Sequence, residues 1–301
     1  MPLVRTIRDV LARVDKWLGR VEVRDTAGQP PPSGRYDEIA AFVRSLDQPD
    51  DAARQYLEIH IPRIARSLTL VPPPRSSGRV LEMGAYMQMT PALQCVLGYK
   101  EVRGAFFGPL GRTDQKSLTI GGREVFRCSV DLFDAEKDSY PYPDGHFETV
   151  LACEIFEHML HDPMHMLLEI NRVLEEDGAL LLTTPNVASF LAVARALEQS
   201  GNPQLYSKFP DPRGEFAETE IPHVREYTPA ELREAVESAG FEVENLFTET
   251  IPGYGTHLWV KDFLEQHRYP IALRGEQIYC VARKRKGREI RRYPKFLYDV
   301  S

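Results

Sequence analysis

The sequence lacks the features that would place the chain in a membrane or cross-link it through disulfides. It has no run of about 20 apolar residues, the length that a membrane-spanning helix needs, and its N-terminus lacks the continuous apolar core of a signal peptide. Its four cysteines lie far apart, without a Cys-x-x-Cys pair or Cys/His metal spacing. We therefore expect a cytoplasmic protein with free thiols, no stable membrane insertion and no bound metal.

Motifs of three common enzyme classes are also missing. The chain has no Gly-x-x-x-x-Gly-Lys-Ser/Thr phosphate loop and no Gly-x-Ser-x-Gly nucleophile elbow. A dinucleotide site needs Gly-x-Gly-x-x-Gly after the first strand, and the chain reads Gly84-Ala-Tyr-Met-Gln-Met there. The net charge of −7 argues against a nucleic-acid-binding surface. The basic run 283–292 is expected to be a solvated edge, with a patch for phosphates or anionic lipids as the alternative.

The first 70 residues are predicted to form a helical extension. Apolar residues recur at helical spacing over 3–21, with charged residues on the other face, which predicts an amphipathic helix. A Pro- and Gly-rich linker follows at 27–34, and two further helices are expected within 36–68. We expect the first helix to dock on the main domain; a dimer contact and a membrane-surface helix are the alternatives.

Residues 71–290 are predicted to form one α/β domain, followed by a tail over 291–301. Short apolar runs alternate with helical stretches, which is typical of a doubly wound, Rossmann-like sheet. We expect about seven strands, mostly parallel with the last one antiparallel. The expected strands are 79–83, 101–107, 124–129, 149–153, 179–184, 242–250 and 277–283, and the expected helices are 90–97, 163–174, 187–199 and 229–239. Ligands of such sheets bind at the carboxyl ends of the strands.

Two segments carry residues suited to ligand binding. The first expected strand ends Val-Leu-Glu82-Met-Gly84, where the acid can accept hydrogen bonds from a cationic amine and the glycine lets the backbone approach a ligand closely. The segment 126–186 contains Asp131, then Pro-Tyr-Pro-Asp-Gly-His-Phe, a Glu157-His158 pair, and a strand ending Thr-Pro-Asn.

These motifs, in this order, resemble the class I S-adenosylmethionine-dependent methyltransferase superfamily over about 79–186. His223-x-Arg-Glu-Tyr-Thr-Pro and Ala-Gly-Phe241 extend the resemblance towards enzymes that methylate sugars and other small metabolites. The resemblance implies S-adenosyl-L-methionine as the cofactor. It also implies that the cofactor is bound by Glu82, Gly84, Ala85, Tyr86, Asp131, Leu132, Cys153 and Glu154, with Asp131 accepting from the adenine amine.

Two positions depart from the family pattern. The family loop usually reads Gly-x-Gly-x-Gly, whereas Tyr86 stands at the second glycine. The second strand usually ends in an acid that holds the ribose hydroxyls, whereas here it ends Phe-Phe107. These departures leave a non-catalytic binding or scaffold protein as one alternative. A nucleic-acid methyltransferase, motivated by the basic run 283–292, is another.

For the chemical step, we expect methyl transfer to a small polar acceptor, with a hydroxyl of a sugar or glycan-like metabolite as the leading substrate. Such a reaction benefits from positioning and from a general base. His223 is the hypothesised base, because it lies in a loop that follows the segment 201–222 and precedes a helix start; the region 201–228 is the expected acceptor lid. His158 is the second catalytic candidate, with a structural role at a helix start as the alternative. The expected acceptor-binding residues are Arg225, Glu226 and Tyr227, with surface ion pairs as the alternative for the first two.

Two other polar groups are expected to face solvent. His161 and His165 have a spacing that can bind a metal, but without an obvious third ligand a solvated helix face is favoured. Asp134, Glu136 and Asp138 are expected to form a solvated acidic loop. The partner is expected to be a small-molecule acceptor rather than nucleic acid, and a homodimer remains an option.

Overall fold

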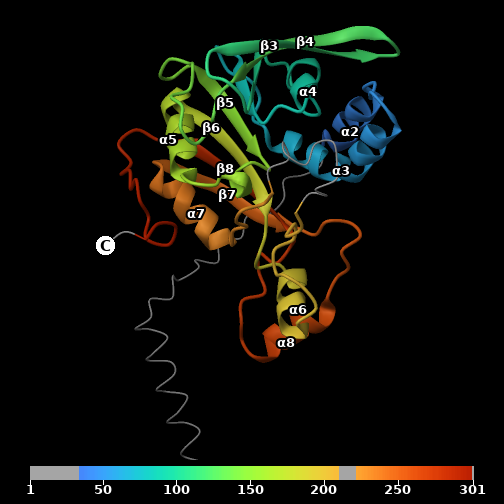
Figure 1. Cartoon of the computed structure of the whole chain (residues 1–301), viewed down its shortest axis with the longest axis vertical. Helices are drawn as coiled ribbons and strands as arrows, with labels where there is room; N and C mark the ends of the chain where they lie inside the picture. Colours follow the sequence, from blue (N-terminus) through green and yellow to red (C-terminus); the bar gives the residue numbers. More distant parts are fainter. Residues whose placement is uncertain (1–33, 210–221, 300–301) are drawn as a thin grey trace, which may run out of the picture.

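The computed structural model describes residues 34–209 and 222–299. The amphipathic helix expected over 3–21, most of the linker and part of the expected lid lie outside these residues. An eight-stranded mixed sheet in the order β3-β4-β2-β1-β5-β6-β8-β7 forms the centre of the molecule (Figure 1). Its strands are β1 (Arg79–Met83), β2 (Glu101–Phe106), β3 (Arg112–Ile120), β4 (Arg123–Leu132), β5 (Phe147–Cys153), β6 (Leu174–Pro185), β7 (Phe241–Glu249) and β8 (Gln277–Lys284).

The predicted doubly wound sheet is confirmed. The strands β4, β2, β1, β5 and β6 run parallel, and β8 is antiparallel to both of its neighbours. The chain winds from β1 outward to β2 and later returns to β5 on the other side of β1. The switch point therefore lies between β1 and β5, where sheets of this kind bind their ligands.

One strand was not predicted. The strand β3 pairs antiparallel with β4 at the sheet edge, and Gly121 and Gly122, with φ of 57° and 76°, form the turn between them. Most of its residues are polar and exposed, so it lacks the apolar run that predicts a buried strand. Its partner β4 is also longer than predicted, and Asp131 lies inside β4 rather than after it.

Alternating strand residues build an apolar core on each face of the sheet. Leu81 and Val150 point to the face covered by α5 and α7, whereas Val80 and Leu151 point to the face covered by α2, α3 and α4. These helices are α2 (Tyr36–Ser45), α3 (Asp51–Leu70), α4 (Thr90–Cys95), α5 (Pro163–Val173) and α7 (Pro229–Ser238). The two helices expected within 36–68 are thus present as α2 and α3; α3 contacts β6 of the sheet, and α2 packs on α3 and α4.

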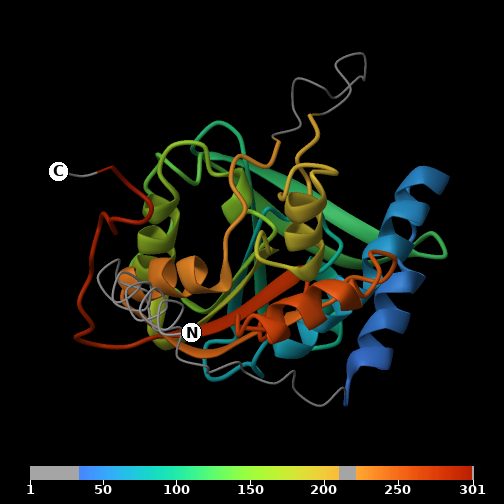
Figure 2. The same ribbon diagram turned by 90° about the horizontal axis from the view of Figure 1, so that it is seen from below.

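A small helical pair lies beyond the carboxyl edge of the sheet. The helices α6 (Phe190–Glu198) and α8 (Leu258–Gln266) contact each other through Ala194, Val260 and Leu264 (Figures 1 and 2). The helix α8 was not predicted from the sequence. Within the described residues, no helix is long and apolar enough to cross a membrane.

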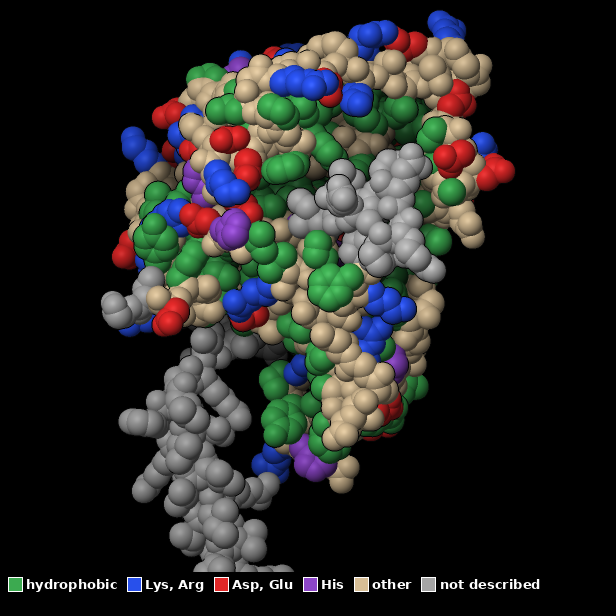
Figure 3. Space-filling view, viewed as in Figure 1, with side chains coloured by type: hydrophobic (Ala, Val, Ile, Leu, Met, Phe, Trp, Pro, Cys, Tyr) green, Lys and Arg blue, Asp and Glu red, His purple; other side chains and the backbone are tan. Residues whose placement is uncertain are grey.

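The basic run is largely paired with acids of the same chain. Arg283 and Arg285 contact Glu244, and Arg285 also contacts Asp177 and Glu242. Further along, Arg291 pairs with Glu234 and Arg292 with Asp162. Positive and negative side chains also lie interspersed over the face shown in Figure 3. The pairing favours the structural interpretation of this run over a phosphate-binding patch.

Candidate active site

The loop after β1 makes a tight turn at Gly84. Gly84 has a φ of 63°, and a Cβ at this position would lie 3.1 Å from the Ile155 side chain. The next amide, of Ala85, donates to the carbonyl oxygen of Ala105 in β2 at 2.9 Å. Tyr86 is 73% exposed, and its ring packs edge-on against Phe106 with centroids 5.1 Å apart. The bulky residue at the glycine position therefore points outward and does not fill the turn.

Glu82 is a buried acid with an unused oxygen. The residue is 4% exposed, and its Oε2 has no hydrogen-bond partner among the described residues. Burial raises the pKa of its carboxyl to about 7. A buried carboxylate oxygen without a donor is costly unless a ligand satisfies it. The cationic amine of an amino acid would fit this position beside the Gly84 turn.

Asp131 is engaged by its own chain. Its carboxylate accepts hydrogen bonds from Arg103 at 2.6 Å, from the Thr113 hydroxyl at 2.7 Å and from the Tyr142 hydroxyl at 2.8 Å. Burial raises the pKa of Asp131, but these bonds outweigh it and hold the pKa below its usual range. Since a carboxylate offers about four acceptor sites, little capacity is left for an adenine amine. The carboxylate therefore joins β2, β3 and β4, and the expected contact with adenine stays a prediction; the adjacent Leu132 is buried.

Cys153 and Glu154 end β5 next to the Gly84 turn. Burial raises the pKa of the Cys153 thiol to about 12, so the thiol stays protonated. Glu154 has a φ of 56°, and its Oε1 accepts from Thr183 at 2.8 Å and from Gln277 at 2.7 Å. Its other oxygen lies 3.6 Å from the Arg63 guanidinium of α3. The helix α3 of the N-terminal extension thus contacts the end of β5, where the cofactor is expected to bind.

The short helix η1 (Phe156–His158) is held to the segment 222–226. The Glu157 carbonyl oxygen accepts from the amides of Val224 at 2.8 Å and Arg225 at 3.2 Å. Its buried side chain accepts from the Thr184 hydroxyl through Oε2, while Oε1 has no partner among the described residues. Burial, reinforced by the charge of Glu154, raises the pKa of Glu157 well above its usual range.

The two predicted catalytic histidines meet at this contact. The rings of His158 and His223 lie with centroids 4.6 Å apart. The Nδ1 of His158 is 3.3 Å from the Pro222 carbonyl oxygen, and the Nδ1 of His223 is 3.2 Å from a carboxylate oxygen of Glu226. One ligand atom from each of Glu157, His158 and His223 lies within 4.8 Å of the other two.

The three residues expected to bind the acceptor all contact other groups of the protein. Glu226 is buried and also accepts from the amides of residues 205 and 206 at 2.6 Å and 2.8 Å. Arg225 forms an ion pair with Glu231 at 2.7 Å, as in the structural alternative. Tyr227 is 1% exposed, and its ring packs in the core against Phe156. This burial gives Tyr227 a structural role in the core, and its predicted role in orienting an acceptor stays untested.

The other polar groups are used within the fold. Glu136 accepts from the amides of His161 and Asp162, so the acidic loop is not simply solvated as expected. The His165 Nε2 donates to the Asp138 carbonyl oxygen at 2.9 Å, while His161 is exposed. These two histidines do not converge on one site.

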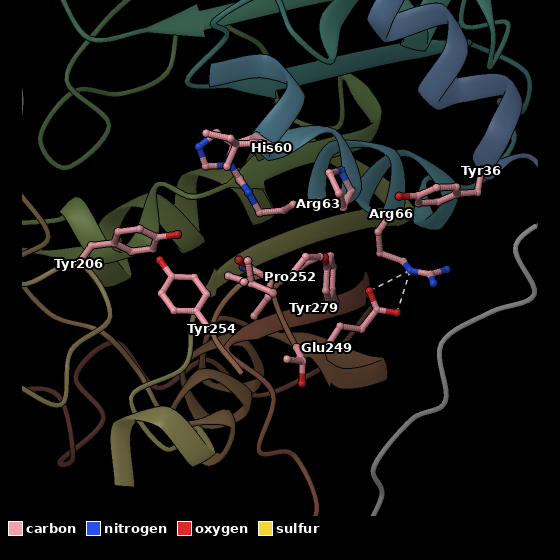
Figure 4. A pocket seen from close by; sticks show the side chains of 15 residues that line it. Tyr36, His60, Arg63, Arg66, Tyr206, Glu249, Pro252, Tyr254 and Tyr279 are labelled. Atoms are coloured by element: carbon pink, nitrogen blue, oxygen red, sulfur yellow. Dashed lines mark hydrogen bonds and ion pairs between the residues drawn. The ribbon is translucent and has the colours of Figure 1, made fainter. Parts of the chain in front are cut away.

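A cavity of about 520 Å³ is lined by Arg63, the partner of Glu154, among other residues (Figure 4). Its walls come from α3, from the loop after β7 and from the start of β8, which pairs with the carboxyl ends of β6 and β7. The polar lining includes His60, Arg63, Arg66, Tyr206, Tyr254 and Tyr279. Burial and the charge of Arg63 lower the pKa of His60 to about 4, which keeps its ring neutral near pH 7. Sequence reasoning missed this cavity, because five separate segments of the chain line it.

Comparison with known proteins gives one consistent result. A family described as a methyltransferase domain matches residues 53–246. A protein of Mycolicibacterium smegmatis named a probable S-adenosylmethionine-dependent methyltransferase is 31% identical over 132 residues, which cover 44% of this chain and 43% of that protein. The match thus spans less than half of the length of that relative.

Two solved structures are similar to this chain at low sequence identity. The complex of the Haloferax volcanii Trm112 methyltransferase activator with a methyltransferase includes a chain with a TM-score of 0.50 and 17% identity, covering 83% of this chain and 96% of that one. A S-adenosylmethionine-dependent methyltransferase of Archaeoglobus fulgidus has a TM-score of 0.47 and 17% identity, covering 76% of this chain and 94% of that one.

Proposed function

The chain belongs to the class I S-adenosylmethionine-dependent methyltransferases, and we propose that it transfers a methyl group to a hydroxyl of a small polar acceptor, such as a sugar or glycan-like metabolite. One observation carries the proposal: Glu154 connects the strand ends where the cofactor is expected to bind with the cavity. It follows β5 at the switch point and contacts Arg63, which lines the cavity.

The residues at the switch point are suited to the amino-acid end of the cosubstrate. Glu82 offers an unpartnered buried oxygen for the amino group, and Gly84 keeps the turn open to close approach. The ribose side differs from the family, because β2 ends at Phe106 where an acid is usual. When bound, S-adenosylmethionine supplies an electrophilic methyl group, and the protein has to orient the acceptor towards it.

The cavity is suited to a polar acceptor that carries hydroxyl groups. Tyrosine rings such as Tyr254 and Tyr279 present both an apolar face and a hydroxyl. The neutral His60 ring has one donor and one acceptor nitrogen, and Arg63 and Arg66 add donors. A ligand that alternates apolar faces with hydroxyls matches this lining.

The histidine pair lies beside the Tyr206 side of the cavity. The ring of Tyr206 lines the cavity and lies 4.9 Å from the His223 ring, centroid to centroid. Donation from Nδ1 of His223 to Glu226 leaves Nε2 as the nitrogen that can accept a proton. In the proposed reaction, this nitrogen accepts the proton of the acceptor hydroxyl.

Calorimetry with S-adenosylmethionine and S-adenosylhomocysteine tests the first half of the proposal. Micromolar binding supports it, whereas no binding at millimolar ligand would favour the scaffold alternative. A screen of sugars and glycosides with radiolabelled cosubstrate then tests the acceptor class.

Two variants separate the acceptor site from the cofactor site. His60→Ala should raise the acceptor KM about tenfold, because one hydrogen bond is worth about 1.4 kcal/mol or less, and should leave cosubstrate affinity unchanged. The exposed His267→Ala serves as the control. His223→Ala should lower turnover with nearly unchanged cosubstrate affinity; loss of that affinity would contradict the assigned role.

A further inference from the structure

We propose that Glu157, His158 and His223 form a binding site for a divalent transition-metal ion such as Zn²⁺. No metal was expected from the sequence, because Glu157 and His158 lie far from His223 along the chain. The binding of the ion stands on the geometry alone, whereas its role in catalysis rests on the proposed function.

The residue set matches a known ligand chemistry. Two imidazoles and one carboxylate bind Zn²⁺ in catalytic sites that keep a position open for a substrate or water. Ligand atoms about 2.1 Å from one ion stand about 3.4 Å apart in a tetrahedron. The three ligand atoms here already lie within 4.8 Å of one another, so small side-chain rotations are enough to close the site.

Both imidazoles are oriented as metal ligands usually are. The Pro222 carbonyl oxygen can only accept, so the Nδ1 of His158 carries the hydrogen in that contact. The Nδ1 of His223 faces the Glu226 carboxylate, which is itself fixed by two backbone amides. Each histidine offers one ring nitrogen to the cluster. A carbonyl or carboxylate behind each ligating histidine is the usual outer-sphere partner of a protein metal site.

Glu157 supplies an independent reason for a cation. The residue is fully buried, and its Oε1 has no hydrogen-bond partner among the described residues, although Oε2 accepts from Thr184. A buried carboxylate oxygen without a donor costs free energy that a coordinated cation removes. Glu157 directly precedes His158 in the chain, and its ligand atom lies within 4.8 Å of the ligand atoms of both histidines.

The position of the site connects it with the cavity. Three protein ligands leave at least one coordination position open, and the neighbouring ring of Tyr206 lines the cavity. An acceptor hydroxyl bound at the open position would become more acidic and would lose its proton to solvent water. In the metal-bound protein His223 acts as a ligand of the ion, and in the metal-free protein it acts as the base described above.

Metal titration of the full chain tests the site directly. The purified protein is first dialysed against a chelator, then titrated with Zn²⁺ by calorimetry and with Co²⁺ by visible absorption. We expect one equivalent to bind, with Co²⁺ bands typical of nitrogen and oxygen ligands. His158→Ala and His223→Ala should each weaken Zn²⁺ binding by at least tenfold.

Matched variants guard against nonspecific effects. His161→Ala and His165→Ala remove histidines that do not converge on one site and should bind Zn²⁺ like the wild type. Glu157→Gln keeps the size of the side chain and should also weaken binding, and circular dichroism checks that each variant folds. Wild-type protein that binds neither ion, or His158→Ala and His223→Ala variants that bind like the wild type, would overturn the proposal.

The two proposals fail in different ways. Zn²⁺ binding without methyl transfer to any hydroxyl acceptor leaves the metal site intact and contradicts the proposed function. Methyl transfer that persists unchanged in chelator-treated protein without measurable Zn²⁺ binding overturns the metal site and leaves His223 as the base.

Discussion

The guanidinium of Arg63 lies 3.6 Å from the carboxylate of Glu154, which joins the N-terminal helix α3 to the residue that follows β5. Both side chains are less than one-fifth exposed, at 19% and 17%. The ion pair therefore lies in a partly desolvated place, where the loss of one partner costs more than at the surface.

Replacing Arg63 by Met should lower the free energy of unfolding by about 3 kcal/mol, because it leaves Glu154 without its cation. Urea unfolding measures the change. Arg54→Met is the matched control on the same helix: Arg54 is 66% exposed and lies 3.9 Å from Asp51, so its loss should cost less than about 0.5 kcal/mol. Equal effects of the two variants would show that the Arg63 pair has no special role.

Glu82→Gln should stabilise the free protein in a pH-dependent manner. The pKa of Glu82 is raised to about 7 in the fold, so the folded chain holds a proton that the unfolded chain loses near pH 4.5. Wild-type stability therefore falls as pH rises from the lower value to the higher one. The variant avoids this loss, which amounts to about 3 kcal/mol at pH 8. Near pH 4, the two proteins should unfold alike.

Thermal unfolding across this pH range, with the exposed Glu101→Gln as control, measures the effect. The same variant should bind S-adenosylmethionine more weakly, because the amide cannot pair with the cosubstrate's amino group as a carboxylate does. A Glu82→Gln protein with wild-type stability at pH 8 would contradict the first expectation.

Asp131→Asn distinguishes a structural role of this residue from the predicted adenine contact. The amide cannot serve both Arg103 and the two hydroxyls, so the free energy of unfolding should fall by about 2 kcal/mol. The affinity for S-adenosylmethionine, measured by calorimetry, should stay near the wild-type value. Asp114→Asn, in the neighbouring strand β3, is the control. Normal stability with lost cosubstrate affinity would restore the adenine contact that the sequence predicted.

Gly84→Ala should harm both folding and binding. The new Cβ would meet Ile155 at 3.1 Å and would force a side chain into a φ of 63°, at a cost of about 1–2 kcal/mol. Gly121→Ala shares a positive φ of 57° but has no atom within 4 Å, so it separates backbone strain from crowding. We expect only Gly84→Ala to weaken cosubstrate binding, as measured by calorimetry.

The sequence was informative where local patterns decide the structure. Strands such as β1 and β5 are continuous apolar runs, and α7 begins with Thr228 and Pro229 in a capping box. The Gly84 turn needs a residue that tolerates positive φ, so its conformation was readable as well. These signals depend on neighbours along the chain, which a single sequence displays.

The features that were missed depend on contacts between distant segments. Tyr227 was expected to bind the acceptor because it lies in a loop beside His223, Arg225 and Glu226. Its ring packs on Phe156, a contact with a residue far away in the sequence. Asp131 was expected to be free at a strand end, but the unpredicted β3 brings Thr113 to it. His158 and His223 were both predicted as catalytic candidates, but the direct contact of their rings could not be predicted, since no periodicity connects them.

The polar strand β3 also affects how the sheet meets other chains. An uncovered sheet edge has unpaired amides and carbonyls that invite pairing with a further strand. Here the outermost strand carries charged residues such as Arg112, Asp114 and Lys116, and such side chains discourage pairing. The hairpin thus limits lateral growth of the sheet, and we expect apolar replacements along β3 to promote aggregation before they alter catalysis.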